Sequence, residues 1–397
     1  MKNNKVVLAF SGGLDTSYCV KYLFHEKNLE VHTAVVDTGG FSPSELVEIA
    51  DKATSLGASS HQALKQTSNY YEHIIKYLIF GNVLKNNTYP LSVSAERIYQ
   101  AIALAEYAKS IDAAYIAHGS TGAGNDQIRF DLIFQLLAPE IEIITPIRDL
   151  QLSRKEEIDY LAEKGVSVDW QQAKYSINKG LWGTSVGGVE TLTSDQGLPE
   201  EAYPSQLTKT EPTTLTIAFT KGEISAVNDQ PMQAVKAIQL VEKLGSAYAI
   251  GRDIHVGDTI IGIKGRVGFE AAAATLIIKA HHSLEKHTLS KWQQHWKEQL
   301  GNWYGMFIHE SQYFEPVMRN IETFLEDTQT NVTGTVKLIL HPYRFEIQGI
   351  TSAHDLMTKA FGEYGEINKN WTGDDVKGFI KMLANPMQIY KHVNKAI

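Results

Sequence analysis

The chain is poor in cysteine, since its 397 residues include only Cys19. A single thiol cannot form an intrachain disulfide and excludes the cysteine clusters that hold zinc or iron–sulfur centres. We expect no metal site held by the protein itself. The first apolar run, residues 6–10, is too short for a signal peptide or a membrane span. The sequence therefore predicts a cytoplasmic protein that does not bind a membrane.

The chain also lacks an excess of positive charge. It has 37 Lys and Arg against 45 Asp and Glu, a formal net charge of −8. This balance argues against a nucleic-acid-binding protein. A hydrophobic content of 43% is typical of a globular protein. A chain of this length exceeds one ordinary hydrophobic core, so we expect two domains and a tail.

Two common nucleotide-binding patterns are absent, G-x-x-x-x-G-K-[ST] and G-x-G-x-x-G, which argues against a Walker-type NTPase and a dinucleotide site. Instead, Ser11-Gly12-Gly13-Leu14-Asp15-Thr16-Ser17 follows the apolar run and precedes an expected helix at 18–24. Glycines, hydroxyls and a helix N-terminus together favour phosphate. The carboxylate of Asp15 beside phosphates suggests an intervening Mg²⁺. The pattern resembles the S-G-G-x-D-[ST]-[ST] loop of ATP pyrophosphatases, although an ordinary tight turn is the alternative.

Strand and helix signals alternate through the first part of the chain. Apolar runs at 31–37, 113–117 and 141–145 predict strands, and Ser42-Pro43-Ser44-Glu45 predicts a helix that opens with a capping box. Such alternation is typical of a doubly wound parallel sheet, which binds nucleotides at the carboxyl ends of its strands. We expect an α/β nucleotide-binding domain over residues 1–165.

The pattern changes after residue 165. Residues 170–212 are rich in Gly, Ser, Thr and Pro and predict a long functional loop region. Hairpins at 214–227 and 333–350, with helices between them, indicate an α+β substrate-binding and multimerisation domain over 166–367. Residues 368–397 form a tail whose helix, 374–393, is expected to break at Pro386 and to dock through an apolar face.

A second glycine-rich loop follows the strand at 113–117, with the sequence His118-Gly119-Ser120-Thr121-Gly122-Ala123-Gly124-Asn125-Asp126-Gln127-Ile128-Arg129-Phe130. Asn125 and Asp126 lie at an expected helix start, and Arg129 lies about one turn later. These side chains can converge on a small zwitterion, with Asp126 binding an ammonium and Arg129 binding a carboxylate through a bidentate fork. The alternative is a glycine-rich turn capped by Asn-Asp.

Together the two loops resemble those of the argininosuccinate synthase family, whose second loop reads H-G-x-T-G-x-G-N-D-Q-x-R-F. The resemblance extends over most of the chain. It implies an adenine nucleotide α-hydrolase-like domain, a C-terminal synthetase domain, a helical tail and a homotetramer. It also implies an ATP-dependent ligation of citrulline and aspartate in arginine biosynthesis. In that reaction a citrullyl-adenylate forms, pyrophosphate and AMP leave, and Mg²⁺ accompanies the nucleotide.

The resemblance implies ligands for named residues, with Asp15 and Asp126 as catalytic residues. It implies an ATP site at the first loop and neighbouring strand ends, made of Ala9, Phe10, Ser11, Gly12, Gly13, Leu14, Asp15, Thr16, Ser17, Val36, Ala117, His118 and Gly119. It implies an aspartate site made of Arg97, Thr121, Asn125 and Asp126. It implies a citrulline site made of Tyr89, Ser94, Asn125, Arg129, Ser176 and Ser185. Tyr89, Ser94 and Arg97 match the family pattern Y-x-L-x-x-S-x-x-R; taken alone they indicate a surface turn and a capping serine.

The chain departs from the family at Ala123, where many members have lysine, and at two later positions. Gly257 and Phe269 replace a glutamate and a tyrosine that contact citrulline in relatives. We expect the ring of Phe269 near citrulline without a hydroxyl to offer; the alternative is a packed core residue. Asp258 and Glu270 are the two alternatives that would replace those contacts, and the sequence leaves both open.

Three other functions fit the sequence less well. A tRNA-modifying enzyme of the same superfamily would have a basic surface and, for thiolation, paired cysteines, which this chain lacks. A non-catalytic nucleotide sensor would leave Asn125, Asp126 and Arg129 without a role. An amidotransferase would need a cysteine nucleophile or another ammonia source.

Overall fold

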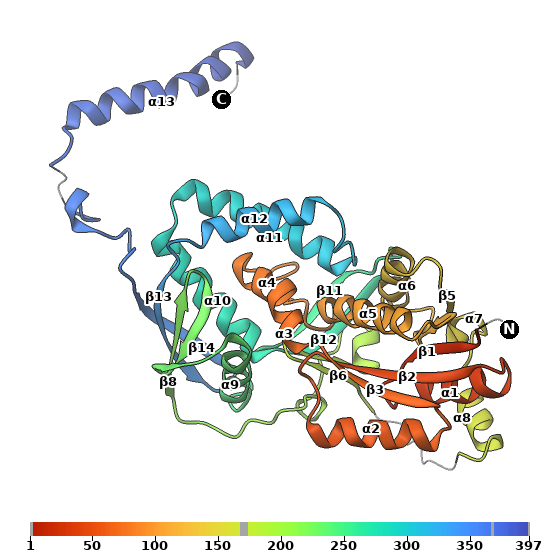
Figure 1. The fold of residues 1–397 in the computed structure, drawn as a ribbon. Helices are drawn as coiled ribbons and strands as arrows, with labels where there is room; N and C mark the ends of the chain where they lie inside the picture. The colour runs from red at the N-terminus through yellow and green to blue at the C-terminus, as the bar shows by residue number, and fades with distance from the viewer. Residues whose placement is uncertain (1–2, 167–173, 367–368, 396–397) are drawn as a thin grey trace.

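A five-stranded parallel sheet forms the N-terminal half of the chain (Figure 1). The computed structural model describes residues 3–166, 174–366 and 369–395. The strand order is β3-β2-β1-β4-β5, with bounds β1 (Lys5–Ala9), β2 (Glu30–Asp37), β3 (Ser60–Lys65), β4 (Tyr115–Ala117) and β5 (Glu142–Ile144). The order reverses between β1 and β4, so the loops after these strands lie side by side.

Helices cover both faces of this sheet (Figure 1). On one face lie α1 (Leu14–His25), α2 (Pro43–Ser55) and α8 (Arg154–Glu163), and on the other α5 (Ser92–Ser110) and α6 (Asp126–Leu137). Successive side chains of β1 point to opposite faces of the sheet. Val6 and Leu8 therefore belong to the hydrophobic cluster that includes α1, whereas Val7 belongs to the cluster that includes α5. The predicted capping box is present, with the Ser42 amide donating to Glu45 at 2.7 Å. The doubly wound prediction is confirmed.

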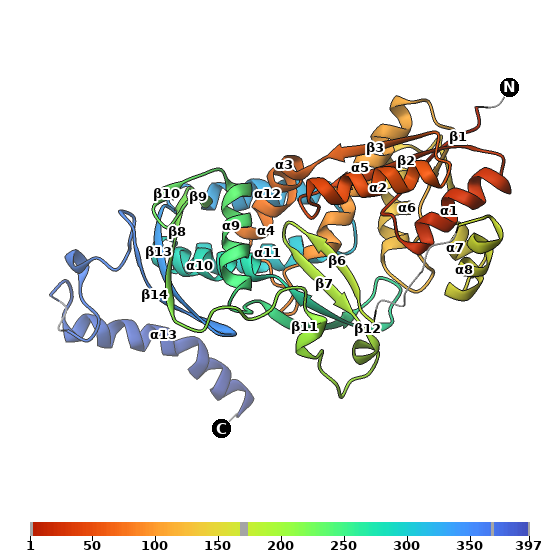
Figure 2. The ribbon, with the colours of Figure 1, turned by 90° about the horizontal axis from the view of Figure 1, so that it is seen from below.

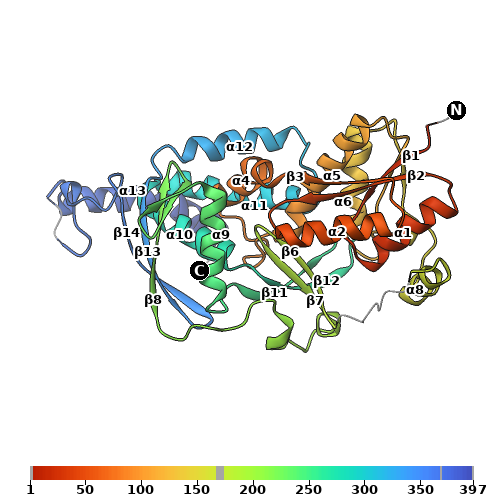
Figure 3. The ribbon, with the colours of Figure 1, turned by 60° about the horizontal axis from the view of Figure 1, so that its bottom comes forward.

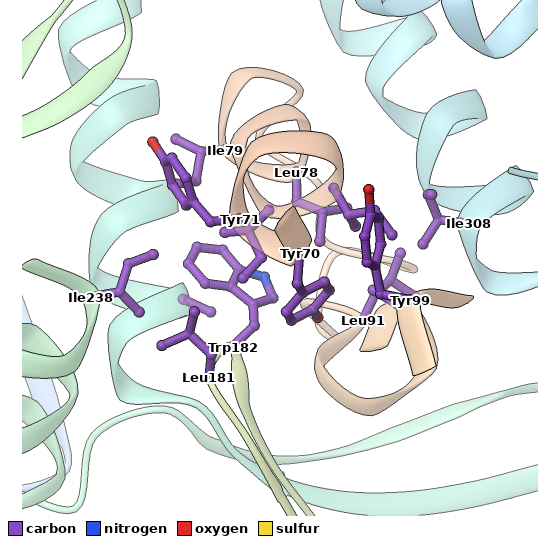
Figure 4. Close-up of a cluster of buried hydrophobic side chains, with 14 of the residues drawn as sticks. Tyr70, Tyr71, Leu78, Ile79, Leu91, Tyr99, Leu181, Trp182, Ile238 and Ile308 are labelled. Carbon is purple, nitrogen blue, oxygen red and sulfur yellow. The ribbon is translucent and has the colours of Figure 1, made fainter. Parts of the chain in front are cut away.

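An aromatic cluster joins the two halves of the chain. The helical segment after β3 comprises α3 (Thr67–Tyr70), a π-helical turn (Tyr71–Ile75) and α4 (Lys76–Phe80). Figure 4 shows Tyr70 and Tyr71 beside Trp182, Ile238 and Ile308, which come from three distant elements. All these side chains are buried. Burial of large aromatic side chains contributes strongly to stability, so this cluster fixes the second half against the nucleotide-binding half.

The second half contains two antiparallel sheets (Figure 2). One has the order β11-β12-β7-β6, with bounds β6 (Ser176–Gly180), β7 (Gly183–Gly187), β11 (Arg252–Asp258) and β12 (Lys264–Glu270). The other has the order β10-β9-β8-β13-β14, with bounds β8 (Thr213–Thr220), β9 (Glu223–Val227), β10 (Gln230–Pro231), β13 (Gly334–His341) and β14 (Arg344–Thr351). The α-helices of this half, before the tail, are α9 (Ala234–Ser246), α10 (Ala272–Thr288), α11 (Lys291–His309) and α12 (Val317–Thr328).

The sequence missed some of these strands. The predicted loop region 170–212 contains the β6–β7 hairpin and two 3₁₀ turns, Val189–Leu192 and Glu200–Ala202, while residues 170–173 lie outside the described ones. β6, with the sequence SINKG, is mostly exposed and has no apolar alternation. β3, β11 and β12 were also not predicted as strands, because polar residues and glycines interrupt them.

The tail contains one long helix, α13 (Gly373–Asn394), which follows a short 3₁₀ turn, Lys359–Phe361. The predicted break at Pro386 is wrong, because the helix continues through it. An exposed helix tolerates proline when water can bond the carbonyl group that loses its partner. Figure 1 shows α13 standing away from the body, whereas in the view of Figure 3 it overlaps α10 and β14. None of its described side chains is buried. Within the described part of the chain, no helix is long and apolar enough to cross a membrane.

Candidate active site

A cavity of about 1050 Å³ lies at the carboxyl ends of β1 and β4, between the first sheet and the β11–β12 ladder. The loop after β1 borders one side of it, and the loop after β4 borders another. Side chains from α5, from the β6–β7 hairpin, from β11 and from the end of α11 complete its walls. This is the position at which doubly wound sheets bind nucleotides.

The first loop turns tightly before α1. Gly12 has a φ of +76°, a conformation that favours glycine, and Gly13 caps the helix. The hydroxyl of Ser17 donates to the Gly13 carbonyl at 2.7 Å, and the ammonium of Lys52 donates to the Gly12 carbonyl at 2.6 Å. Ser11 and Thr16 line the cavity with their hydroxyls 3.5 Å apart. The loop is thus held from behind while its front faces open space at a helix N-terminus.

Two carboxyl groups meet beneath this loop. Asp15 lines the cavity, and Glu157 of α8 is buried behind it. Burial, followed by the charge of Asp15, raises the pKa of Glu157 to about 8. Glu157 is therefore largely protonated at neutral pH, and Asp15 is the carboxyl group of the pair that faces the cavity. In the described residues, no three His, Cys, Asp or Glu side chains are grouped so as to hold a metal ion.

The side chain of His118 anchors the second loop. Its Nε2 lies 2.8 Å from an oxygen of Asp131, and its Nδ1 accepts from the Ser120 amide at 3.2 Å. Asp131 also accepts from Arg148 at 2.7 Å. An Nδ1 that accepts requires the proton on Nε2, so the ring donates to Asp131. The imidazole is nearly fully buried, and it fixes the loop from inside the protein while Gly119 borders the cavity.

Asp126 lies between two arginines at the centre of the cavity. One carboxylate oxygen accepts from Arg97 Nε at 2.9 Å, and the other accepts from Arg129 Nη1 at 2.9 Å. Burial alone would raise the pKa of Asp126, but Arg97 and Arg129 lower it to about 2. Asp126 therefore stays ionised at neutral pH and holds a charge in place.

Arg129 is engaged more fully than the sequence predicted. Its Nε and Nη2 both donate to the backbone carbonyl of His309, at 3.2 and 3.0 Å, and Nη1 donates to Asp126. The predicted bidentate fork for a substrate carboxylate is thus largely occupied by the protein. Arg129 still lines the cavity, so it contributes charge there more than a free pair of donors.

Arg97 keeps more of its donors available. Nε donates to Asp126, Nη1 to Gln100 at 2.8 Å, and Nη2 to Asn178 at 3.3 Å. A guanidinium group has about five N–H donors, so two on the outer nitrogens remain. Asn125, the N-cap of α6, accepts from the Ile260 amide at 2.9 Å and so ties this loop to the β11–β12 turn.

Tyr89 and His255 form the wall opposite the glycine loop. Their rings stack with centroids 5.1 Å apart, and both residues are buried and line the cavity. Phe269 packs against Tyr89 at 5.3 Å and is only 2% exposed. It does not line the cavity, so the expectation that its ring faces citrulline is wrong and the core alternative applies. Gly257, two residues after His255 on β11, does line it.

The structure brings most of the predicted site residues into this one cavity. The following line it: Ala9, Phe10, Ser11, Gly13, Leu14, Asp15, Thr16, Val36, Tyr89, Ser94, Arg97, His118, Gly119, Thr121, Asn125, Asp126, Arg129, Ser176 and Ser185. Three predicted residues do not line it: Gly12, Ser17 and Ala117. Ser17 turns its hydroxyl into the loop, and Ala117 is buried within β4.

Among the lining residues that sequence reasoning missed, three carry buried titratable groups, namely Glu96, His255 and His309. Glu96 lies beneath Arg97, and burial raises the pKa of Glu96 to about 7. Burial, followed by the charge of Lys85, lowers the pKa of His255 to about 4. Burial, followed by the charge of Arg129, lowers the pKa of His309 to about 3. Both histidines are therefore neutral at physiological pH. Glu96 lies within the predicted segment from Tyr89 to Arg97 but at an unspecified position of its pattern, and no local pattern marks either histidine.

Comparisons with known proteins agree along the whole chain. The model for the "Arginosuccinate synthase N-terminal HUP domain" matches residues 5–167, and that for the "Arginosuccinate synthase C-terminal domain" matches residues 175–390. Argininosuccinate synthase of Xylella fastidiosa is 34% identical over 404 residues, covering 100% of both chains. That of Dictyoglomus thermophilum is 35% identical, covering 98% of both, and that of Methanocaldococcus jannaschii is 34% identical, covering 97% of both.

Proposed function

Since the chain belongs to the argininosuccinate synthase family, we propose that the cavity between its two halves carries out that family's ligation of citrulline to aspartate with ATP. The observation that carries the proposal is the meeting of two groups in one cavity. The glycine loop offers a phosphate site, and Asp126, held between Arg97 and Arg129, lines the same cavity. An adenylating ligase needs both a nucleotide site and an amino-acid site.

The nucleotide is assigned to the loop after β1. The amides at the start of α1 and the hydroxyls of Ser11 and Thr16 would bind the phosphates. Val36 and His118–Gly119 would border the adenosine. Mg²⁺ fits as an ion bound mainly by phosphates, because Asp15 supplies one carboxyl group to the cavity and Mg²⁺ commonly takes one or two. Bound there, the ion would offset the phosphate charge.

The chemistry follows from activation of a poor electrophile. The ureido oxygen of citrulline attacks the α-phosphorus of ATP, pyrophosphate leaves, and a citrullyl-adenylate remains. The amine of aspartate then attacks the ureido carbon, and AMP leaves. No covalent enzyme intermediate is required, so the protein acts by positioning its substrates and stabilising charge.

The amino-acid subsites are assigned by their chemistry. The two remaining N–H donors of Arg97 suit the carboxylates of aspartate, while Thr121, Asn125 and Asp126 surround its amine. With a pKa near 2, Asp126 orients that amine and does not take its proton. Citrulline is assigned to Tyr89, Ser94 and Arg129 across the cavity, with Asn125, Ser176 and Ser185 completing its site.

We further propose the domain division 1–165, 166–367 and 368–397, with the tail as an assembly element of a homotetramer. Apolar side chains of α13, such as Phe379, Leu383 and Tyr390, are more than half exposed in the single chain. An apolar face of this kind favours burial against another subunit. We also expect the enzyme to act in the cytoplasm, without nucleic acid.

A label-transfer experiment tests the reaction. The enzyme is given ATP, aspartate and citrulline that carries ¹⁸O in its ureido group. The label should appear in AMP, because the ureido oxygen becomes bonded to the α-phosphorus. Pyrophosphate should be released in equal amount. Formation of ADP, or of AMP without label, would contradict the mechanism. Without aspartate no ligation product should form, but the exchange of added pyrophosphate into ATP should still be measurable.

A further inference from the structure

The end of the cavity around His255 differs chemically from the rest. His255 and Gly257 lie two residues apart on β11 and so project from the same face of the strand, and both are buried while Val256 and Asp258 between and beyond them are exposed. A Cβ atom at position 257 would lie 2.6 Å from the Nε2 of His255. The imidazole therefore occupies the place where a side chain at 257 would begin.

The carboxylates that line the cavity are all engaged elsewhere. Asp126 is held by Arg97 and Arg129, and Asp258 pairs with Lys264 at 2.7 Å on the exposed side of the strand. The remaining carboxyl groups are Asp15 at the glycine loop, Glu45 in the capping box of α2, and Glu96 beneath Arg97. In the described part of the chain, the wall of Tyr89, His255 and His309 thus presents no carboxylate of its own.

The positive charges at this end point the same way. Arg129 lies against His309. The positive charge of Lys85 contributes, after burial, to lowering the pKa of both His255 and His309. The charges of Glu310 and Asp258 raise the pKa of Lys85, against the larger effect of burial, and neither is paired with Arg129. An ammonium group placed here would meet cations and neutral imidazoles, and the lining carboxylate at this end, Asp258, is already paired with Lys264.

An unsatisfied polar atom also lies at this wall. The Nδ1 of His255 is buried and has no hydrogen-bond partner among the described residues, and the whole residue is only 5% exposed. A neutral imidazole can both donate and accept, as an amide can. The wall is therefore built to contact an uncharged polar group.

We propose that the ureido substrate of this enzyme carries an uncharged α-nitrogen, as an Nα-acylated citrulline does, and that His255 contacts its amide. This inference rests on the proposed function, since it concerns the citrulline subsite of the same reaction. The ligation at the ureido end is unchanged, because acylation alters only the far end of the molecule. His255 and Gly257 are then the residues that set the choice of substrate.

Steady-state kinetics with two substrates test the inference. Pyrophosphate release is measured with ATP, Mg²⁺ and aspartate, and with either L-citrulline or Nα-acetyl-L-citrulline varied. We expect kcat/KM for the acetylated substrate to exceed that for citrulline by at least about tenfold, which corresponds to about 1.4 kcal/mol. If citrulline is used equally well or better, the inference fails and the proposed ligation stands. If neither compound supports pyrophosphate release, the proposed function fails as well.

A pair of variants isolates the role of charge. In Gly257→Glu/His255→Ala the imidazole makes room for a carboxylate, and the preference should shift toward citrulline by about tenfold or more. In the matched control Gly257→Gln/His255→Ala the volume is the same but the charge is absent, so no such shift is expected. An equal shift in both variants would overturn the charge argument. If the variants do not fold, the comparison of the two substrates with the unmodified enzyme decides the question.

Discussion

The substitution Arg97→Lys tests the aspartate subsite most directly. Arg97 makes three hydrogen bonds within the protein, to Asp126, Gln100 and Asn178, at 2.9, 2.8 and 3.3 Å. Lysine keeps the positive charge but has one nitrogen, so it cannot hold Asp126 and also present two parallel donors to a carboxylate. Loss of a charge-assisted hydrogen bond costs about 1.5–3 kcal/mol, which corresponds to roughly 10- to 150-fold in kcat/KM for aspartate.

The assay varies aspartate at saturating ATP and ureido substrate. The effect should fall on aspartate, and the KM for ATP should change little, because the hydrogen bonds of Arg97 go to Asp126, Gln100 and Asn178 and not to the glycine loop. Arg344→Lys provides a matched control, since Arg344 pairs with Glu346 on the exposed surface of β14. That variant should stay within about 0.5 kcal/mol of the unmodified enzyme in stability and activity. Unchanged kcat and KM for aspartate in Arg97→Lys would refute the assignment.

Three further predictions concern the tail, the core and pH. Deleting residues 368–397 should lower the oligomeric mass measured by light scattering, and a truncated enzyme that keeps its mass would exclude an assembly role. Phe269→Tyr should lower the melting temperature, because a hydroxyl buried behind Tyr89 costs about 1–3 kcal/mol without a partner, whereas an unchanged temperature would show that the hydroxyl is accommodated. The raised pKa of Glu157, about 8, means that the folded protein binds a proton that the unfolded chain has lost, so this residue's contribution to stability should fall as pH rises from about 4.5 to 8. Calorimetry at pH 5–8 should show a flatter profile and a higher melting temperature at pH 8 for Glu157→Gln; parallel profiles would contradict this.

The parts of the site that the sequence predicted are those whose pattern is local. The glycine loop, the capping box at Ser42 and the Asn125–Asp126 helix start each depend on neighbouring residues, and all are present as expected. The glycine loop after β1 and the loop after β4 that leads to Asn125 meet because the strand order reverses between β1 and β4. The prediction of the fold succeeded for the same reason, since apolar runs and caps are local signals.

The parts that escaped prediction depend on contacts between distant segments. The main partner of Arg129 is a backbone carbonyl 180 residues later, and a carbonyl leaves no mark in a sequence. The strand β11 that carries His255 and Gly257 contains charged residues and a glycine, so its alternation is weak. Phe269 matched a family position in alignment but packs behind Tyr89, because alignment fixes a place on the chain and not the group that covers it.

The three central residues of the amino-acid site share one property. Each comes from the N-terminal half and is bonded to the C-terminal half: Arg97 to Asn178, Asn125 to the Ile260 amide, and Arg129 to the His309 carbonyl. The glycine loop, in contrast, is held from within its own half by Ser17 and Lys52. The nucleotide site is therefore complete within the first sheet and its helices, whereas the amino-acid site acquires its geometry only when the two halves pack together. Substrate choice can then change through residues of the second half, such as His255 and Gly257, without disturbing the loop that binds phosphate.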